Sequence, residues 1–350
     1  MSKTIPSILF SLLVTSLFIS PQISFSSSPT QQSVFDMMNY SEVIKMTLEL
    51  DRNALTSNLR SEDKYPAVLS FVDYKGEDLK WNTKVSLRGK FRRLKCNGML
   101  PLKINFKKKE LKAAGLARFD DLKLVPHCIE DPVLAKEWLL KEYLAYKIYN
   151  VLTDISYRVQ LVEITYKDIK TEESETQFAF LIEDTAQLRD RLNAEKVESK
   201  FGTKQEDFNR DQVKNVALFQ YMIGNADWDI NVSQNIKLVR QNGQLIAIPY
   251  DFDFSGLVNA EYALPNSSKN IRSVQERVYL GFEEDLEKQK ATVRLFKNKK
   301  KSIIQTIKDF KLLKKQSRRE VINYINTFYH NIDDIKTPKM LADIIATRSE

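Results

Sequence analysis

The sequence is poor in glycine, cysteine and histidine. Its 350 residues include nine glycines, two cysteines and two histidines. With histidine only at His127 and His330, a zinc site built from several histidines is implausible, and a serine–histidine–aspartate triad has few candidates. The scarcity of glycine argues against a glycine-rich loop that wraps phosphate groups. Hydrolysis based on histidine is therefore disfavoured.

The rest of the composition is that of an ordinary globular protein. Hydrophobic residues make up 43% of the chain and charged residues 29%, which is enough apolar material for one large core or two lobes. The sequence shows no internal repeat.

The N-terminus has the order of a secretory signal. Lys3 precedes an apolar run over 8–19, and small serines follow over 24–28. We expect residues 1–26 to be a signal peptide and 27–40 a polar leader. The alternative is an uncleaved membrane anchor, but the run is short for a span of about 20 residues. We therefore expect a secreted, periplasmic or cell-envelope protein with no membrane span after signal removal.

Export would place the two cysteines in an oxidising compartment. In an oxidising compartment a lone pair of cysteines in one domain commonly forms a disulfide, so we expect Cys96 to be bonded to Cys128. The alternative is two unrelated buried thiols.

The chain carries a formal net charge of +8, and much of the excess lies over 297–319. Apolar residues recur there at helical spacing, which indicates an amphipathic helix with a solvated basic face. Binding to an anionic surface is the alternative. Export argues against nucleic acid as a partner.

Hydrophobic periodicity predicts strands first and mainly helices later. Strands are expected at 65–73, 84–88, 101–107, 121–125, 157–166 and 177–182. A long helix is expected from Pro132, behind the N-cap candidate Asp131, and further helices at 185–192, 211–223, 274–285 and in three segments after Ala291. This order predicts an α+β fold of two lobes, a β-rich one with a single long helix over 41–184 and a mainly helical one over 185–350.

The most informative stretch is a predicted hairpin. Asn242-Gly243 is a strong hairpin-turn signal, and counting outward from it places Asn235 opposite Tyr250. Asn235 and Asp251 then emerge side by side at the open end. Asp227 and Asp229 lie in the loop that feeds the first strand.

These oxygen ligands suit Mg²⁺ or Mn²⁺ bound with a nucleotide phosphate. In protein kinases a catalytic aspartate is followed by a metal-binding asparagine, a hairpin and a metal-binding aspartate. The sequence has that order. The alternative is a polar hairpin whose carboxylates are merely solvated.

The pattern Gly-Asn-x-Asp…Asn…Pro-Tyr-Asp-Phe-Asp resembles the spore-coat-protein-H family of secreted kinase-like proteins. The segments 87–90, 101–106, 141–146 and 180–183 resemble other parts of that family. The similarity spans about half of the chain, and it implies a protein-kinase-like fold with ATP or another nucleotide as cofactor.

The resemblance also implies roles for individual residues. Asp227 would be the catalytic base and Asn235 and Asp251 metal ligands, with Asp253 as a further ligand. The resemblance further implies that Lys103 is the phosphate-binding lysine and that Glu142, on the long helix, is its ion-pair partner. Arg88 and Gly89 would lie near the phosphates. For each of these last residues the alternative is an ordinary solvated strand, helix or turn position.

The spacing departs from that of kinases, in which the asparagine follows the catalytic aspartate by five positions. Here the loop is longer, so Asp229 is a second candidate for the base, and the departures leave room for an inactive homologue. We expect a phosphotransferase acting on a hydroxyl, such as Ser or Thr of another exported protein. The alternatives are a catalytically silent binding module of the cell envelope and a metal-dependent phosphoesterase.

Overall fold

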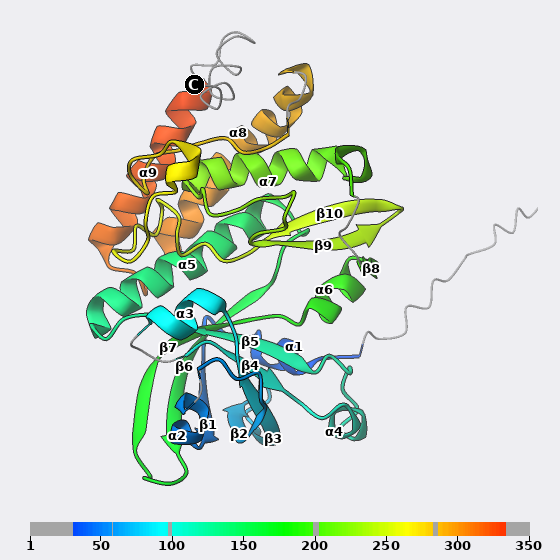
Figure 1. Cartoon of the computed structure of the whole chain (residues 1–350), viewed down its shortest axis with the longest axis vertical. Helices are drawn as coiled ribbons and strands as arrows, with labels where there is room; N and C mark the ends of the chain where they lie inside the picture. The colour runs from blue at the N-terminus through cyan, green and yellow to red at the C-terminus, as the bar shows by residue number, and fades with distance from the viewer. Residues whose placement is uncertain (1–30, 58, 97–99, 199–202, 283–285, 334–350) are drawn as a thin grey trace, which may run out of the picture. The chain divides into compact units, whose positions relative to one another are not determined.

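Seven strands in the N-terminal part of the chain close into a barrel (Figure 1). The computed structural model describes residues 31–333, apart from 58, 97–99, 199–202 and 283–285. Around the barrel the strands follow the order β1-β2-β3-β4-β5-β7-β6, and β1 completes the ring by pairing in parallel with β6. The strands are β1 (Val43–Leu50), β2 (Tyr65–Val72), β3 (Asp78–Leu87), β4 (Leu102–Asn105), β5 (Asp121–Pro126), β6 (Val159–Asp168) and β7 (Ser174–Ile182).

Alternation along the strands separates the barrel core from its outer face. Ile104 on β4 and Leu122 on β5 are direct partners, and both are buried in the core. The next pair along these strands, Lys103 and Lys123, must point to the opposite face, because successive side chains alternate across a sheet. Both lysines therefore lie outside the barrel.

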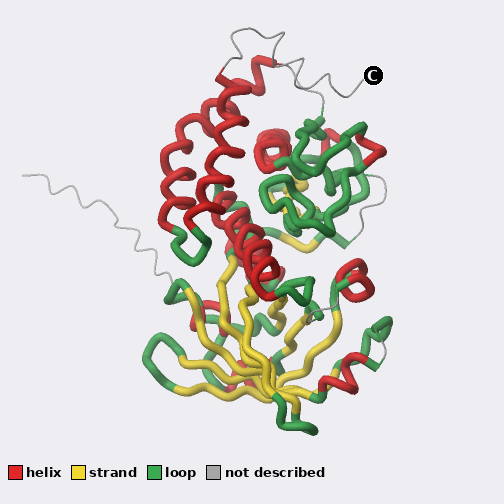
Figure 2. The backbone as a smooth tube through the Cα atoms, turned by 90° about the vertical axis from the view of Figure 1, so that its left-hand side faces the viewer, coloured by secondary structure: helices red, strands yellow, loops and turns green. Residues whose placement is uncertain are grey.

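The long helix α5 (Pro132–Leu152) begins where the sequence predicts. Its N-cap Asp131 accepts hydrogen bonds from the backbone N–H groups of Val133 and Leu134, at 2.9 and 3.0 Å. The helix contacts β6 and β7 and also α8, and Figure 2 shows long helices gathered at one end of the strands. The other α-helices are α1 (Val34–Met38), α2 (Arg52–Thr56), α3 (Lys90–Lys95), α4 (Lys108–Ala113), α6 (Thr185–Arg191), α7 (Arg210–Ile223), α8 (Leu286–Asp309) and α9 (Lys315–Asp333).

The predicted hairpin is confirmed. Strands β9 (Ile236–Gln241) and β10 (Gln244–Pro249) are joined by Asn242-Gly243, and both turn residues have positive φ, 49° and 78°. The register continues beyond the strands, because the N–H of Tyr250 donates to the carbonyl of Asn235 at 3.0 Å. A short strand, β8 (Glu195–Lys196), completes this second sheet.

Gly224 ends α7 and opens the loop that carries Asp227. Its φ of 63° lies in the left-handed region, and a Cβ at this position would collide with the hydroxyl of Tyr324. Glycine is therefore required at this point, where the chain turns from the helix toward the hairpin.

The two-lobed protein-kinase-like fold expected from the sequence is wrong. The N-terminal strands form a closed barrel of seven strands where a β-rich lobe was expected. The closure depends on β1, which no motif marks and which pairs along its length with β6 and also with β2. The described residues from 32 onward belong to one compact unit.

The helix expected over 274–285 is also wrong over 274–282, the part that the structure describes. Val278, Tyr279, Leu280 and Phe282 are all buried, so this stretch buries nearly consecutive residues where a helix would bury one face. The guanidinium of Arg277 further holds the segment by donating to the carbonyl oxygens of Met222 and Tyr324.

The predicted signal peptide lies outside the described residues, and so does the third helical segment expected after α9. Part of the stretch interpreted as a polar leader forms α1, whose Val34, Phe35 and Met38 are buried. In the described part of the chain, no helix combines the length and apolar character needed to cross a membrane.

The disulfide between Cys96 and Cys128 is confirmed, with Cα atoms 4.6 Å apart and a sequence separation of 32. Replacing both cysteines by serine is expected to lower the free energy of unfolding by about 3–4 kcal/mol, because the crosslink restricts the unfolded chain. Urea unfolding of the oxidised protein and of the double variant measures this difference. An unchanged unfolding midpoint would contradict the prediction.

Candidate functional site

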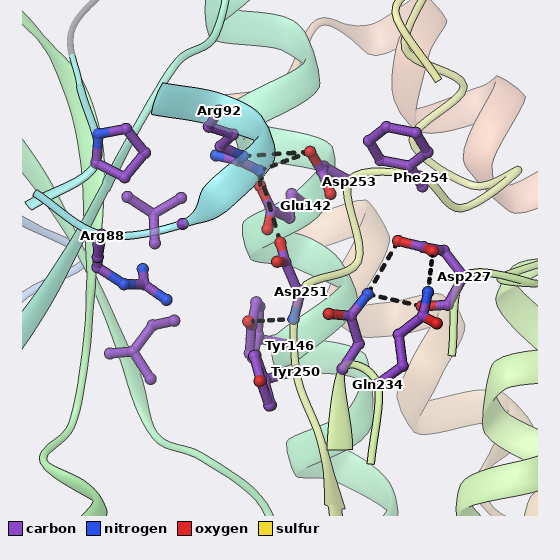
Figure 3. A pocket seen from close by; sticks show the side chains of 15 residues that line it. Arg88, Arg92, Glu142, Tyr146, Asp227, Gln234, Tyr250, Asp251, Asp253 and Phe254 are labelled. Carbon is purple, nitrogen blue, oxygen red and sulfur yellow. Dashed lines mark hydrogen bonds and ion pairs between the residues drawn. The ribbon is translucent and has the colours of Figure 1, made fainter. Parts of the chain in front are cut away.

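A cavity of about 360 Å³ lies where α3, β5, β7, α5 and the open end of the β9–β10 hairpin meet (Figure 3). Four carboxylates line it, contributed by α5, by the loop before β9 and by the segment after β10. Arg88 and Arg92 line it as well. The acids are Glu142, Asp227, Asp251 and Asp253.

Asp227 is held at the cavity by the two residues that precede β9. Its carboxylate accepts hydrogen bonds from the side-chain amides of Gln234 and Asn235, the latter at 2.9 Å. Burial raises the pKa of Asp227 to about 6, and the nearby charge of Asp251 adds to the rise. A carboxyl group with such a pKa can accept a proton near neutral pH.

Asp229, the second candidate for the base, is placed differently. It does not line the cavity, and its carboxylate accepts hydrogen bonds from the backbone N–H groups of Asn231 and Val232. Its other oxygen lies 3.8 Å from the ammonium of Lys269. Asp229 therefore shapes the loop that presents Asp227.

Asn235 and Asp251 both line the cavity, as the hairpin register predicts. The backbone of Asp251 has a φ of 67°, and its N–H donates to the hydroxyl of Tyr146 on α5 at 2.8 Å. This bond fixes the turn after β10. The side chain of Asp251 is 42% exposed and lies toward the open cavity.

Arg92 lies among three of the carboxylates, a position that no sequence motif predicts. Its guanidinium is 2.7 Å from Glu142, 3.0 Å from Asp253 and 3.9 Å from Asp251 (Figure 3). Burial raises the pKa values of Glu142 and Asp253, and the charge of Arg92 opposes both shifts.

This acidic cluster fits a divalent metal ion. Ligand oxygens of Glu142, Asp251 and Asp253 lie within 4.8 Å of one another. Arg92 supplies one positive charge against three negative ones, so a further cation would relieve the excess of charge. Carboxylate oxygens are hard ligands of the kind that Mg²⁺ and Mn²⁺ prefer.

The phosphate-binding residues expected from the resemblance are only partly brought together. Arg88 and Gly89 line the cavity, and the guanidinium of Arg88 has no hydrogen-bond or ion-pair partner in the described part of the chain. Lys103 does not line the cavity, because its ammonium pairs with Asp121 at 2.6 Å. The expected contact between Lys103 and Glu142 is replaced by the Arg92–Glu142 pair.

Lys123 is a second lysine on the same face of the barrel, and it also does not line the cavity. It stands two residues before the cavity-lining Val125 on β5, and its ammonium donates to the hydroxyl of Thr185 at 3.0 Å. Burial lowers the pKa of Lys123 to about 7, and the positive charge of Arg88 lowers it further. Arg88 thus reaches the cavity across from Asp227 and Asp251, and Lys123 lies outside the cavity lining, near enough to Arg88 for the two charges to interact.

Sequence reasoning missed Arg92 and Lys123. The alternation over 121–125 places Lys123 on the same face as Lys103, so the pattern identifies two lysines and cannot choose between them. Nothing in the sequence around Arg92 distinguishes it from the neighbouring Arg93.

The chain matches no known protein-family model, and no curated protein matches it at a significant level. The resemblance to the spore-coat-protein-H family therefore rests on the quoted motifs and stays a prediction.

Proposed function

We propose that the protein is a metal- and nucleotide-dependent phosphotransferase that acts on a hydroxyl acceptor. The observation that carries the proposal is the division of charge around one cavity. Carboxylates of Asp227 and Asp251 stand on one side, and the guanidinium of Arg88 stands on the other. Lys123 lies outside the lining but interacts electrostatically with Arg88. A polyphosphate with a bound divalent metal requires this combination of cations and hard oxygen ligands.

Asp227 is assigned as the general base. It would accept the proton of the acceptor hydroxyl while that oxygen forms a bond to the terminal phosphorus and the bond to the leaving nucleoside diphosphate breaks. The amides of Gln234 and Asn235 fix the carboxylate, so that it does not rotate away from the acceptor. The raised pKa of Asp227 suits a base that works near neutral pH.

Asp251, with Asn235 beside it in the cavity lining, is assigned to hold Mg²⁺ or Mn²⁺. When bound, the metal neutralises charge on the phosphates. Arg88 would bind a phosphate oxygen directly, because its guanidinium faces the cavity without a competing carboxylate partner among the described residues. Lys103 is not assigned to the phosphates, since Asp121 already neutralises it.

The acceptor is proposed to be a serine or threonine of another exported protein, and the site of action the cell envelope or the exterior. This part of the proposal rests on the N-terminal signal pattern and on the disulfide, which is typical of oxidising compartments.

The direct test is to incubate the purified mature chain with labelled ATP, with and without Mg²⁺ or Mn²⁺. Phosphate transfer to the chain itself or to an added protein, dependent on the metal, is the expected result. Metal-dependent nucleotide binding without transfer would remove the enzymatic part of the proposal. Release of phosphate with no acceptor labelled would indicate a phosphoesterase.

One observation favours a second candidate, a catalytically silent binding module. Arg92 already supplies a cation to Glu142 and Asp253, which reduces the need of these acids for a metal. For this candidate, neither Mn²⁺ nor ATP would bind at millimolar concentration in a calorimetric titration.

Lys123 provides a pH-dependent test of nucleotide binding. Since its pKa is lowered to about 7, most of this lysine is neutral at pH 8, and nearby phosphate would raise the pKa again. Binding of ATP at pH 8 is therefore expected to take up nearly one proton, and binding at pH 6 almost none. Calorimetry in buffers of different ionisation enthalpy measures this uptake.

Lys123→Met should abolish the proton uptake, whereas Lys103→Met, on the same face of the barrel but paired with Asp121, should keep it. Equal uptake by the Lys123→Met variant and the wild type would show that another group titrates.

A further inference from the structure

Arg92 is a buried charge on a short helix, α3. The helix has six residues, and its N-cap Gly89 provides no side-chain hydrogen bond. Among the side chains of α3 that the structure describes, Arg92 alone is buried, while Leu94 is 56% exposed. Hydrophobic packing by these described residues therefore does not explain why α3 stays on the acidic cluster.

The disulfide supplies an attachment for α3 at this place. Cys96 is the C-cap of α3, four residues after Arg92, and it is bonded to Cys128. Cys128 follows Pro126 by two residues, and the carbonyl oxygen of Pro126 accepts a hydrogen bond from Arg92 at 3.2 Å. The crosslink and the guanidinium thus anchor α3 to the same short segment.

The contacts of Arg92 divide the three acids into two kinds. Glu142 and Asp253 lie within 3.0 Å of the guanidinium, and their side chains are 3% and 6% exposed. Asp251 is 3.9 Å away and 42% exposed. The first two acids thus share one buried counter-charge, and the third is open to the cavity.

We propose that Arg92 is a positioning residue that acts as a built-in cation, held in place by the disulfide. It occupies the position that a second metal ion would take between Glu142 and Asp253. Asp251 is left as the carboxylate of the cluster that binds a single metal ion. This inference rests on the proposed function and deepens it by setting the metal stoichiometry of the site at one.

The test is a titration with Mn²⁺ alone, without nucleotide, followed by calorimetry and by the electron paramagnetic resonance signal of free Mn²⁺. Wild-type protein is expected to bind one ion. Arg92→Met should bind two, because Glu142 and Asp253 lose the guanidinium with which both form ion pairs and then form a second site with hard oxygen ligands. Arg92→Lys, which keeps the charge, should return to one ion.

Arg93→Met is the matched control. Arg93 is the next residue of α3 and donates to the backbone carbonyls of Gly89 and Ser61, away from the carboxylates. This variant should bind one ion, like the wild type. Equal stoichiometry in Arg92→Met and Arg93→Met would overturn the inference and leave the proposed function intact.

The two failures are distinguishable in the same titration. Should the wild type bind no Mn²⁺ while Arg92→Met binds one ion, the built-in cation is supported and the metal dependence of the proposed function fails. Should neither protein bind Mn²⁺, both are overturned.

The wild-type protein gives a second measurement that does not depend on the folding of any variant. Reduction of the disulfide by a phosphine removes the crosslink of α3, so that Arg92 is free to move away from Glu142 and Asp253, and it changes no side chain of the acidic cluster chemically. With the fold checked by circular dichroism, the reduced protein is expected to gain the second Mn²⁺ site, and reoxidation should remove it. A reduced protein that still binds a single ion with unchanged affinity would overturn the role of the disulfide.

Discussion

Replacing Asp227 with asparagine is expected to lower the rate of phosphoryl transfer by about 10²–10⁴-fold, the usual contribution of a general base. Asparagine preserves the size of the side chain but cannot accept the proton of the acceptor hydroxyl. Nucleotide affinity should change little, because the base contacts the acceptor and not the nucleotide. Single-turnover measurement of transfer, beside a binding titration, separates the two effects.

Asp229→Asn is the matched control for this prediction. It makes the same chemical change two residues away, in a side chain that caps its own loop and does not line the cavity. Its effect on transfer should be much smaller than that of Asp227→Asn. If Asp229→Asn is the more damaging substitution, the base has been assigned to the wrong aspartate, although the class of reaction survives.

The geometry of the hairpin could be predicted from the sequence because it is decided locally. The turn Asn242-Gly243 requires positive φ at two positions, and this requirement fixes the register of both strands. Counting outward then places Asn235 and Asp251 together without knowledge of any other part of the chain. The same local reasoning places the start of α5, where Asp131 caps the helix.

The closure of the barrel could not be predicted in this way. Strand β1 has alternating burial, but its parallel pairing with β6 joins residues more than 110 positions apart, such as Val43 and Leu161. No turn signal connects the two strands. The sequence therefore shows that strands exist, while the ring they form depends on contacts that sequence periodicity does not record.

The ion-pair partners of the charged residues could not be predicted from the sequence either. Lys103 and Lys123 occupy neighbouring positions on one face, and what separates them is Asp121 beside the first and burial around the second. Arg92 reaches Glu142 only because α3 lies beside the middle of α5. Local pattern identifies which residues face the site, and the packing of distant segments decides which of them interact.

Replacing Asp251 with alanine is expected to abolish metal-dependent nucleotide binding. Among the cluster acids, Glu142 and Asp253 are engaged by Arg92, so Asp251 is the carboxylate whose oxygens remain open to a metal. Loss of an outer-shell partner alone typically weakens metal binding by about 10–100-fold, and loss of a direct ligand should exceed that. Residual binding through Arg88 and Lys123 should persist and should no longer respond to Mn²⁺.

The measurement is a titration of ATP into wild-type protein, Asp251→Ala and the control Asp229→Ala, each with Mn²⁺ and with a chelator. The control removes the same charge from the same side of the molecule but from a residue outside the cavity lining, so it should keep the metal response. If Asp251→Ala keeps the full Mn²⁺ response, residues other than Asp251 bind the metal and this assignment is wrong. A wild-type protein whose affinity for ATP is the same in Mn²⁺ and in chelator would instead exclude the metal-dependent phosphotransferase and leave the binding module as the function of this cavity.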